Sequence, residues 1–159
     1  MSLVFNDIHK AFGPKKVLKG VDLEVRTGEV LFIIGTSGVG KSVTIKHIIG
    51  LLKPDQGEIL LDGEPIHDLK EKDYYPVRKR CGMVFQSSTL FDSLSVVENV
   101  ILPLRKHKGL KGKTAREKAM SLLDKVGMTR YADVFPAALG DGMRKRVALA
   151  RSLAGEPEI

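Results

Sequence analysis

Apolar and polar residues alternate along two stretches near the start of the chain, residues 3–8 and 17–25. A period of two places successive side chains on opposite faces of a strand, so each stretch is predicted as a half-buried β-strand. A third stretch, Val30 to Ile34, follows the turn signal Thr27-Gly28 and is apolar at every position. Such a run predicts a strand that is buried on both faces.

After a glycine-rich segment the spacing of apolar residues becomes helical. It predicts a helix from Lys41 to Leu52, which Lys53-Pro54 should end. The stretches 58–61 and 64–66 flank the pair Asp62-Gly63, the residue pair that favours a tight β-hairpin. The first half of the chain is therefore predicted as β-rich with a helix after the glycine-rich segment.

The second half of the chain is predicted to be helical. A short apolar run, Met83 to Phe85, predicts one more strand, which ends at Gln86. Three helices are predicted beyond it: Val96 to Leu104, stopped near Pro103; a helix opened by the capping box Thr114-Ala115-Arg116-Glu117 and running to about Val126; and Gly142 to Ala154, stopped by Gly155.

Composition adds limits to this picture. The chain has 159 residues, 43% of them hydrophobic, which is typical of one folded domain and not of a disordered chain. Its single cysteine, Cys81, excludes an internal disulfide and agrees with a reducing cytoplasm. The first ten residues lack the apolar core of a signal peptide, and no apolar run approaches the roughly 18 residues of a membrane span.

The net charge of +7 leaves several anionic partners open. Basic residues are densest in residues 105–118 and in Arg144 to Arg146. A solvated helix face explains such clusters, and neither has interleaved aromatics for stacking on single-stranded nucleic acid. We therefore expect no nucleic-acid partner.

The glycine-rich segment carries the strongest chemical signal. It matches the phosphate-binding pattern G-x-x-x-x-G-K-[ST] in full, as Gly35, Thr36, Ser37, Gly38, Val39, Gly40, Lys41 and Ser42. Glycines let the loop fold tightly around an anion, and the following helix adds the positive end of its dipole. Lys41 is expected to neutralise the β- and γ-phosphates, and Ser42 to offer its hydroxyl to Mg²⁺. The segment, with Val43 after it, predicts a site for ATP and Mg²⁺.

Three further features matter only in combination. Phe12, 23 residues before Gly35, could stack on adenine with Val17 beside it, although an isolated phenylalanine is more often a core residue or a loop anchor. Gln86 ends a predicted strand, where an amide can reach a metal or a water. The third feature is a glycine-containing turn before the last predicted helix, formed by Leu139, Gly140, Asp141, Gly142 and Met143.

These four features, in this order, resemble the nucleotide-binding domain of ATP-binding-cassette (ABC) transporters. The resemblance makes Phe12 the aromatic loop, the segment from Gly35 to Ser42 the Walker A motif, and Gln86 the Q-loop and a metal contact. Leu139 to Met143 would be the signature motif, which contacts ATP held by a second subunit. The implied fold is α/β: a P-loop NTPase core with an antiparallel β subdomain in residues 1–86 and a helical subdomain in residues 87–159.

Residues 85–104 and 142–151 resemble, more narrowly, the ATPases of Mce-associated lipid transporters. That resemblance implies an ATP-binding subunit that energises phospholipid transport across the bacterial envelope. It would work as a homodimer on an integral membrane permease, at the inner face of the cell membrane. Importers of amino acids or methionine share much of the pattern and remain the alternative.

Two departures from the family pattern limit the prediction. Residues 156–159 correspond to the segment just before the strand that carries Walker B and the catalytic glutamate, and none of the four histidines stands where the switch histidine would. We therefore expect this chain to bind ATP but not to hydrolyse it alone, which leaves a non-hydrolysing nucleotide-binding module as a further alternative. In the signature motif, Gly140 replaces a serine and Asp141 a glycine. Asp141 is predicted to cap the last helix and to repel the partner's triphosphate.

Overall fold

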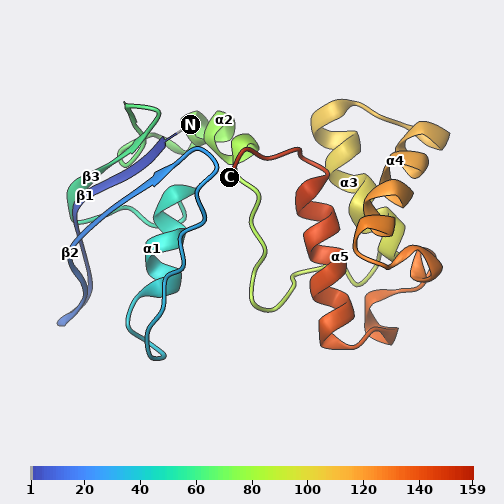
Figure 1. Cartoon of the computed structure of the whole chain (residues 1–159), viewed down its shortest axis with the longest axis horizontal. Helices are drawn as coiled ribbons and strands as arrows, with labels where there is room; N and C mark the ends of the chain where they lie inside the picture. Colours follow the sequence, from blue (N-terminus) through green and yellow to red (C-terminus); the bar gives the residue numbers. More distant parts are fainter. Residues whose placement is uncertain (1) are drawn as a thin grey trace. The chain divides into compact units, whose positions relative to one another are not determined.

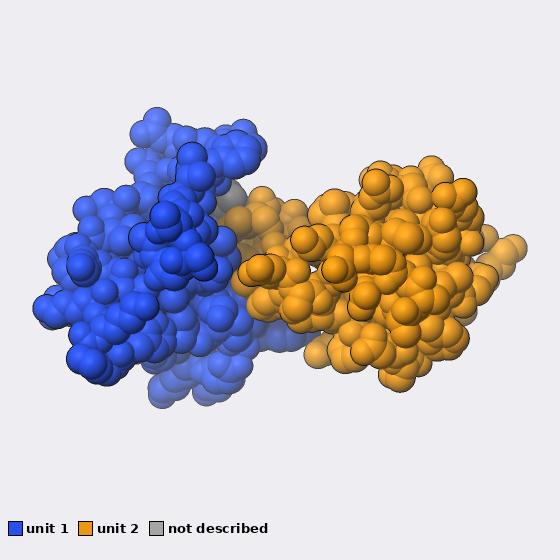
Figure 2. Space-filling model, turned by 90° about the horizontal axis from the view of Figure 1, so that it is seen from below, with its two compact units in different colours: residues 1–78 blue, residues 79–159 orange. Residues whose placement is uncertain are grey.

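The computed structural model describes residues 2–159 and divides the chain into two compact units, residues 1–78 and 79–159 (Figures 1 and 2). Each unit has its own buried core and is described by itself. The family-based subdomain boundary after Gln86 stays a prediction.

The first unit is built on an antiparallel sheet of four strands (Figure 1). The strands lie in the order β2-β1-β3-β4. Strands β1 and β2 form one hairpin and β3 and β4 a second, and the two hairpins are joined by antiparallel pairing of β1 with β3. Their bounds are β1 Ser2–Phe12, β2 Lys15–Arg26, β3 Gln56–Leu61 and β4 Glu64–Pro65. The alternating stretches and the Asp-Gly hairpin predicted from the sequence are confirmed.

A bulge in β1 keeps the apolar side chains of this strand on one face. The register shifts between Phe5 and Ile8, and Asp7 adopts a left-handed φ of 50°. Gly57 on β3 faces this bulge, and a Cβ there would collide with the backbone carbonyl of Asp7. The shift restores the alternation, so that Phe5 and Ile8 are both fully buried despite their odd spacing.

Helices complete the core of the first unit. Helix α1, Lys41–Ile48, is shorter than predicted, because the chain turns at Gly50 with a left-handed φ of 65°. A 3₁₀ turn η1, Glu71–Asp73, leads into α2, Tyr74–Arg80, which the sequence pattern did not reveal. The buried core residues are Leu3, Phe5, Ile8, Leu18, Ile59, Leu61, Ile66, Tyr74 and Val77.

The prediction of a doubly buried strand at Val30–Ile34 is wrong for this structure. The segment forms no strand, and Val30, Phe32 and Ile34 are 74%, 81% and 91% exposed. No strand of the described sheet pairs with it. An apolar run predicts burial, but a strand forms only where neighbours satisfy its backbone groups, and residues 2–159 provide none.

The predicted strand Met83–Phe85 is likewise absent, although a parallel pairing begins beside it. The Gly82 amide donates to the Ile159 carbonyl at 2.7 Å, and the Ile159 amide donates to the Arg80 carbonyl at 3.1 Å. In a parallel ladder, one residue of a strand bonds to two residues of the other strand that are separated by one position, as Ile159 does here with Arg80 and Gly82. These hydrogen bonds end at Gly82, so residues 83–85 form no strand in this structure.

In the residues that the structure describes, the second unit contains helices α3, α4 and α5 (Figure 1), with two 3₁₀ turns between α4 and α5. Their bounds are α3 Val96–Lys108, α4 Gly112–Lys125, η2 Thr129–Tyr131, η3 Pro136–Ala138 and α5 Asp141–Leu153. Their apolar faces form one core, made of Val96, Val97, Val100, Leu104, Ala119, Leu122, Leu123, Met128, Ala132, Leu139, Val147, Ala150 and Ala154.

The end of α3 differs from the prediction. The helix continues through Pro103 to Lys108 and ends at Gly109, whose φ is 66°. Its start carries a complete capping box, in which the Ser95 hydroxyl accepts from the Glu98 amide and the Glu98 carboxylate accepts from the Ser95 amide. The box fixes the entry of α3 into the core.

The predicted start of α4 is wrong, whereas α5 begins within one residue of the predicted start but without Asp141 as its cap. Helix α4 begins at Gly112 with Lys111 as N-cap, so Thr114 lies inside the helix and caps nothing. Helix α5 has Gly140 as N-cap and Asp141 as its first residue. Asp141 therefore meets the helix dipole, but no side chain caps the first amides of α5.

None of the helices described in residues 2–159 is both long and apolar enough to span a bilayer.

Candidate functional site

The glycine-rich loop is wound tightly against β2 and ends at α1. Gly40 is buried, has a φ of 113° and forms the N-cap of α1. A Cβ at Gly40 would lie 2.9 Å from a Leu18 methyl group, and one at Gly35 would lie 2.9 Å from a Val39 methyl group. Gly35 also has a positive φ, of 157°, which side chains rarely adopt. Glycine is therefore required at both ends of the loop, which explains the spacing of the motif.

The start of α1 presents a cation together with free amide groups. The Lys41 ammonium donates to the carbonyls of Gly35 and Thr36, at 2.6 and 2.8 Å, so it curls back over the loop. The first amide of the helix to find a backbone acceptor is that of Thr44, which donates to Gly40 at 2.9 Å. The preceding amides, Lys41 to Val43, belong to the helix turn whose donors have no intrahelical acceptor. This combination suits a phosphate group.

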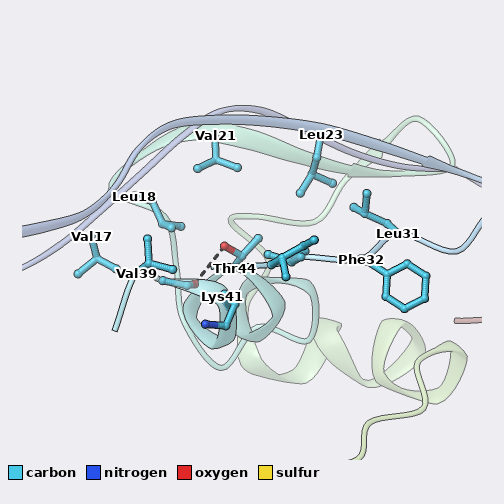
Figure 3. Close-up of a pocket in the computed structure, with 12 residues that line it drawn as sticks. Val17, Leu18, Val21, Leu23, Leu31, Phe32, Val39, Lys41 and Thr44 are labelled. Atoms are coloured by element: carbon cyan, nitrogen blue, oxygen red, sulfur yellow. Dashed lines mark hydrogen bonds between the residues drawn. The ribbon is translucent and has the colours of Figure 1, made fainter. Parts of the chain in front are cut away.

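An apolar pocket of about 460 Å³ lies behind the loop (Figure 3). Figure 3 shows Val21 and Leu23 pointing from β2 toward α1, with Leu31 at the far side. The lining residues are Val17, Leu18, Val21, Leu23, Leu31, Phe32, Ile33, Ile34, Val39, Gly40, Lys41 and Thr44. The apolar residues 31–34, which form no strand, make one wall of the pocket. The glycine-rich loop with Lys41 closes the other, polar end.

The two residues proposed to hold the base belong to the β1–β2 hairpin. Val17 is half-buried and lies against Gly40, so the structure brings it to the loop. Phe12 ends β1 with 45% of its surface exposed, and the Lys10 ammonium lies 5.8 Å from its ring centre. The same ammonium donates to the Asp55 carboxylate at 2.6 Å, which fixes its place over the ring. The exposed remainder of the ring is free to stack.

Gln86 and the signature residues lie in the second unit. Gln86 is exposed, in a turn. Leu139 is buried, and Met143 packs against the helical core, so these two anchor the signature segment. Gly140 and Asp141 are exposed at the start of α5, where the Asp141 carboxylate lies 3.5 Å from the guanidinium of Arg144.

The signature glycines have no steric requirement for glycine. A Cβ added at Gly140 or at Gly142 would meet nothing within 4 Å, and neither has a left-handed φ. A serine at position 140 would therefore fit, and it would occupy the N-cap position of α5.

Sequence reasoning missed two residues that shape the loop. Thr44 is buried, and its hydroxyl donates to the Gly40 carbonyl at 3.2 Å, which ties the loop end to the second turn of α1. Leu18 follows Val17 on β2 and packs against Gly40. The alternation of apolar and polar residues in this strand predicts that some of its side chains are buried, but it does not predict a contact with a loop about 20 residues later in the chain.

The donor set fits Mg²⁺ bound through a nucleotide better than a metal held by protein alone. Within residues 2–159 no three histidine, cysteine or acidic side chains gather as a metal site. Mg²⁺ bound through phosphates needs only one or two protein ligands. The exposed Ser42 hydroxyl on the first turn of α1 is suited to such a role.

Comparison with known proteins agrees with this geometry. The sequence profile described as ABC transporter matches residues 18–159. The methionine import ATP-binding protein MetN of Mesorhizobium japonicum is 41% identical over 156 residues, which are 96% of this chain and 42% of that protein. The intermembrane phospholipid transport system ATP-binding protein MlaF of Haemophilus influenzae is 40% identical over 147 residues, 92% of this chain and 56% of that protein.

A third relative is the probable ribonucleotide transport ATP-binding protein mkl of Mycobacterium tuberculosis, 38% identical over all of this chain and 44% of its own length. The chain thus spans between 42% and 56% of the length of these three relatives.

Solved structures share the fold. The dimeric bacterial ABC transporter cassette MJ0796 superposes with a TM-score of 0.90 at 33% identity, covering 98% of this chain and 70% of that one. CbiO1 of Clostridium perfringens, part of the transporter complex cbiONQ, gives 0.84 at 33% identity, covering 98% and 62%. With its profile match, its relatives and this fold, the chain belongs to the ABC transporter family.

Proposed function

We propose that this chain is the nucleotide-binding part of an ABC transporter ATPase and that it binds ATP with Mg²⁺ at residues 35–43. The observation that carries the proposal is the Lys41 ammonium held over the loop by two carbonyls of the loop itself. A phosphate chain entering the loop would take over this cation and the free amides at the start of α1.

The remaining contacts follow from the residues around the loop. Phe12 would stack on the adenine with Val17 beneath it, because Val17 already lies against Gly40. Ser42 would bind Mg²⁺, and by the family resemblance Gln86 would contact the metal or its water. The metal, when bound, would neutralise the charge that develops on the phosphates during transfer.

Hydrolysis is proposed for the complete gene product. Attack by water on the γ-phosphate needs a carboxylate that orients that water, and no residue in positions 2–159 stands in the motif that supplies it. The parallel pairing between Arg80, Gly82 and Ile159 supports a further strand continuing beside Met83–Phe85. The greater length of the relatives supports the same proposal.

In the complete protein we propose a homodimer on the inner face of the cell membrane, docked on an integral membrane permease. Leu139 to Met143 of one copy would contact the ATP of the other. The MJ0796 relative was solved as a dimer and the CbiO1 relative is part of a transporter complex, which supports this assembly. ATP would close the dimer and product release would reopen it, because the two states differ in affinity for the nucleotide.

The proposed cargo is a phospholipid. Residues 85–104 and 142–151 carry the lipid-transport pattern, and the Haemophilus influenzae relative serves phospholipid transport by its name. Methionine import is the second candidate, since the relative from Mesorhizobium japonicum matches at 41% identity.

ATP binding tests the site directly. Affinity for ATP·Mg²⁺ would be measured by titration calorimetry for the wild type, for Lys41→Ala and for Lys46→Ala, a control lysine near the C-terminal end of the same helix. Removal of a charge-assisted contact to phosphate is expected to weaken binding by about tenfold or more. Equal affinity in all three proteins would refute the site.

The cargo requires the complete gene product with its permease in vesicles. Phospholipid supply should raise the ATPase rate if the lipid proposal is correct, whereas L-methionine should raise it if the second candidate is correct. A rate that responds to neither would exclude both cargoes while leaving ATP binding intact.

A further inference from the structure

The segment that follows Gln86 holds two neighbouring residues in a disfavoured backbone conformation. Ser88 and Thr89 have φ values of 63° and 44°, in the left-handed region that non-glycine residues avoid. Ser88 is also buried. Such a conformation persists only where surrounding contacts determine it. We call residues 86–91 the Gln86 loop.

One side chain supplies most of these contacts, and it comes from the signature helix α5. Arg151 donates through Nη1 to the Thr89 carbonyl at 2.9 Å. Through Nη2 it approaches the Ser88 carbonyl at 3.4 Å and the Thr89 hydroxyl at 3.3 Å. Its guanidinium also lies 5.8 Å from the centre of the Phe91 ring. The planar fork of arginine suits two successive carbonyls, which a lysine could not match.

Arg151 carries its charge without an acidic partner. In the part of the chain that the structure describes, every recorded contact of this side chain goes to the Gln86 loop. Burial lowers the pKa of the guanidinium from its usual value, and no carboxylate raises it. A half-buried arginine without a carboxylate is costly unless its donors are satisfied, so the loop and the arginine stabilise each other.

The far end of the loop is fixed by a different helix. The Asn99 side chain on α3 accepts from the Phe91 amide at 2.9 Å and donates to the Phe91 carbonyl at 3.0 Å. By contrast, Gln86 is exposed, and the structure gives its side chain no hydrogen bond within residues 2–159. The backbone that carries Gln86 is therefore set from its C-terminal side, where Arg151 is the contact to α5.

We propose that Arg151 is a positioning residue that couples the signature helix α5 to the loop bearing Gln86. This inference rests on the proposed function, in which both elements serve the same ATP cycle. A displacement of α5 when ATP binds at its N-terminus would move the Ser88–Thr89 backbone, and with it Gln86. The recorded contacts of Arg151 within residues 2–159 go to the Gln86 loop and not to residues 35–43, so we expect turnover to change more than nucleotide affinity.

The test uses the complete gene product with Arg151→Gln, Arg151→Lys and the control Arg146→Gln, an exposed arginine on the same helix. Amide exchange by mass spectrometry is expected to speed up about tenfold in the Gln86 loop of Arg151→Gln, with α3 and α5 unchanged. Arg151→Lys should restore part of the protection, and Arg146→Gln should resemble the wild type.

Activity supplies the second readout. Arg151→Gln is expected to lower kcat for ATP hydrolysis about tenfold while KM for ATP stays unchanged, the pattern of a lost interaction outside substrate binding. Wild-type exchange in the Gln86 loop of Arg151→Gln would overturn the proposal. So would equal loss of protection throughout the second unit, or failure of both Arg151 variants to fold, because Arg151 would then be a general stabiliser.

The two proposals fail separately. If the wild type binds no ATP, the proposed function is wrong whatever the exchange shows. If the wild type binds ATP but the Gln86 loop ignores Arg151, only the coupling is wrong.

Discussion

Asp141 is the residue at which this chain departs most from the ABC signature pattern. Its carboxylate is exposed on the first turn of α5 and lies 3.5 Å from the guanidinium of Arg144. The helix dipole and Arg144 both stabilise a negative charge there, whereas a triphosphate bound to a second copy would be repelled by it. The departure thus favours the helix and opposes the composite site.

We predict that Asp141→Asn strengthens ATP-driven dimerisation of the complete gene product by about fivefold, since an exposed charge contributes modestly. Analytical ultracentrifugation with and without ATP·Mg²⁺ would measure it. Asp124→Asn, which neutralises an exposed carboxylate on α4, should leave dimerisation unchanged. No difference between the two variants would show that the charge at position 141 is irrelevant to dimer closure.

His47 makes the stability of the first unit sensitive to pH. It is fully buried on α1, and its Nδ1 lies 2.7 Å from the Val43 carbonyl. Burial lowers the pKa of the His47 imidazole below its ordinary 6.5; Lys10 lowers this pKa further, while the Val43 carbonyl and Asp55 oppose the shift. As the pH falls, the His47 imidazole therefore takes up a proton more readily in the unfolded chain than in the folded chain.

The sign follows from this difference. His47 imposes no stability loss above pH 6.5, and stability falls as the pH drops below that value. We predict a lower melting temperature at pH 5.5 than at pH 7.5, with a smaller pH dependence in His47→Phe than in His107→Gln, the more exposed control. A melting temperature of the wild type that is flat across this range would contradict the prediction.

At the scale of elements, the two capping-box sequences of the second unit should contribute differently to stability, because only the one at Ser95 caps a helix. Ser95 bonds the Glu98 amide at the start of α3 and is buried, whereas Thr114 lies inside α4. We predict that Ser95→Ala lowers the free energy of unfolding by about 1 kcal/mol. Thr114→Ala should change it by less than about 0.5 kcal/mol.

Urea denaturation followed by circular dichroism would compare the two alanine variants. The reverse order, with Thr114→Ala the more destabilising, would mean that α4 starts at the capping box that the sequence suggested.

The exposed apolar run Val30–Ile34 is a second feature at this scale. We predict that Phe32→Ser changes the melting of the 159-residue chain little and lowers its binding of a hydrophobic dye, because Phe32 is 81% exposed. If strands outside residues 1–159 cover the run in the complete gene product, the same change should cost about 3–5 kcal/mol there.

Leu104→Ala serves as the control, because Leu104 is fully buried in the second unit. It should destabilise both forms of the protein by about 2–5 kcal/mol. Equal effects of Phe32→Ser in the two forms would show that the run is not a strand in either.

Local patterns predicted local structure well and failed where a distant partner decides. The alternation in β1 and β2 and the Asp62-Gly63 turn depend on neighbours a few residues away, and these elements formed as expected. Val30–Ile34 needs strands on both sides, which no local signal provides. Pro103 predicts a stop, but α3 continues through a basic last turn to Lys108 and ends at Gly109.

The candidate site was predictable to a similar degree. The motif from Gly35 to Ser42 specified its own backbone, since the required glycines are those that a Cβ would obstruct. The contact of Arg151 with the Gln86 loop joins residues 62 positions apart and depends on the packing of α5, so the spacing of residues along the sequence could not predict it.

At the scale of the whole molecule, nucleotide binding and the signature residues belong to different compact units. The Gly35–Ser42 loop lies within residues 1–78, and α5 lies within residues 79–159. Binding of ATP at residues 35–43 should therefore stabilise the first unit.

Thermal unfolding with and without ATP·Mg²⁺ tests the central claim, that this chain holds the nucleotide in its glycine-rich loop. At about 100 times the dissociation constant, ligand binding adds about 2.7 kcal/mol, enough to raise the melting temperature of a unit this small by about 10 °C. We predict that rise for the wild type and for Lys46→Ala. Lys41→Ala should show about half of it, because tenfold weaker binding leaves about 1.4 kcal/mol at the same ATP concentration. An unchanged wild-type melting temperature, or the same rise in Lys41→Ala, would contradict it.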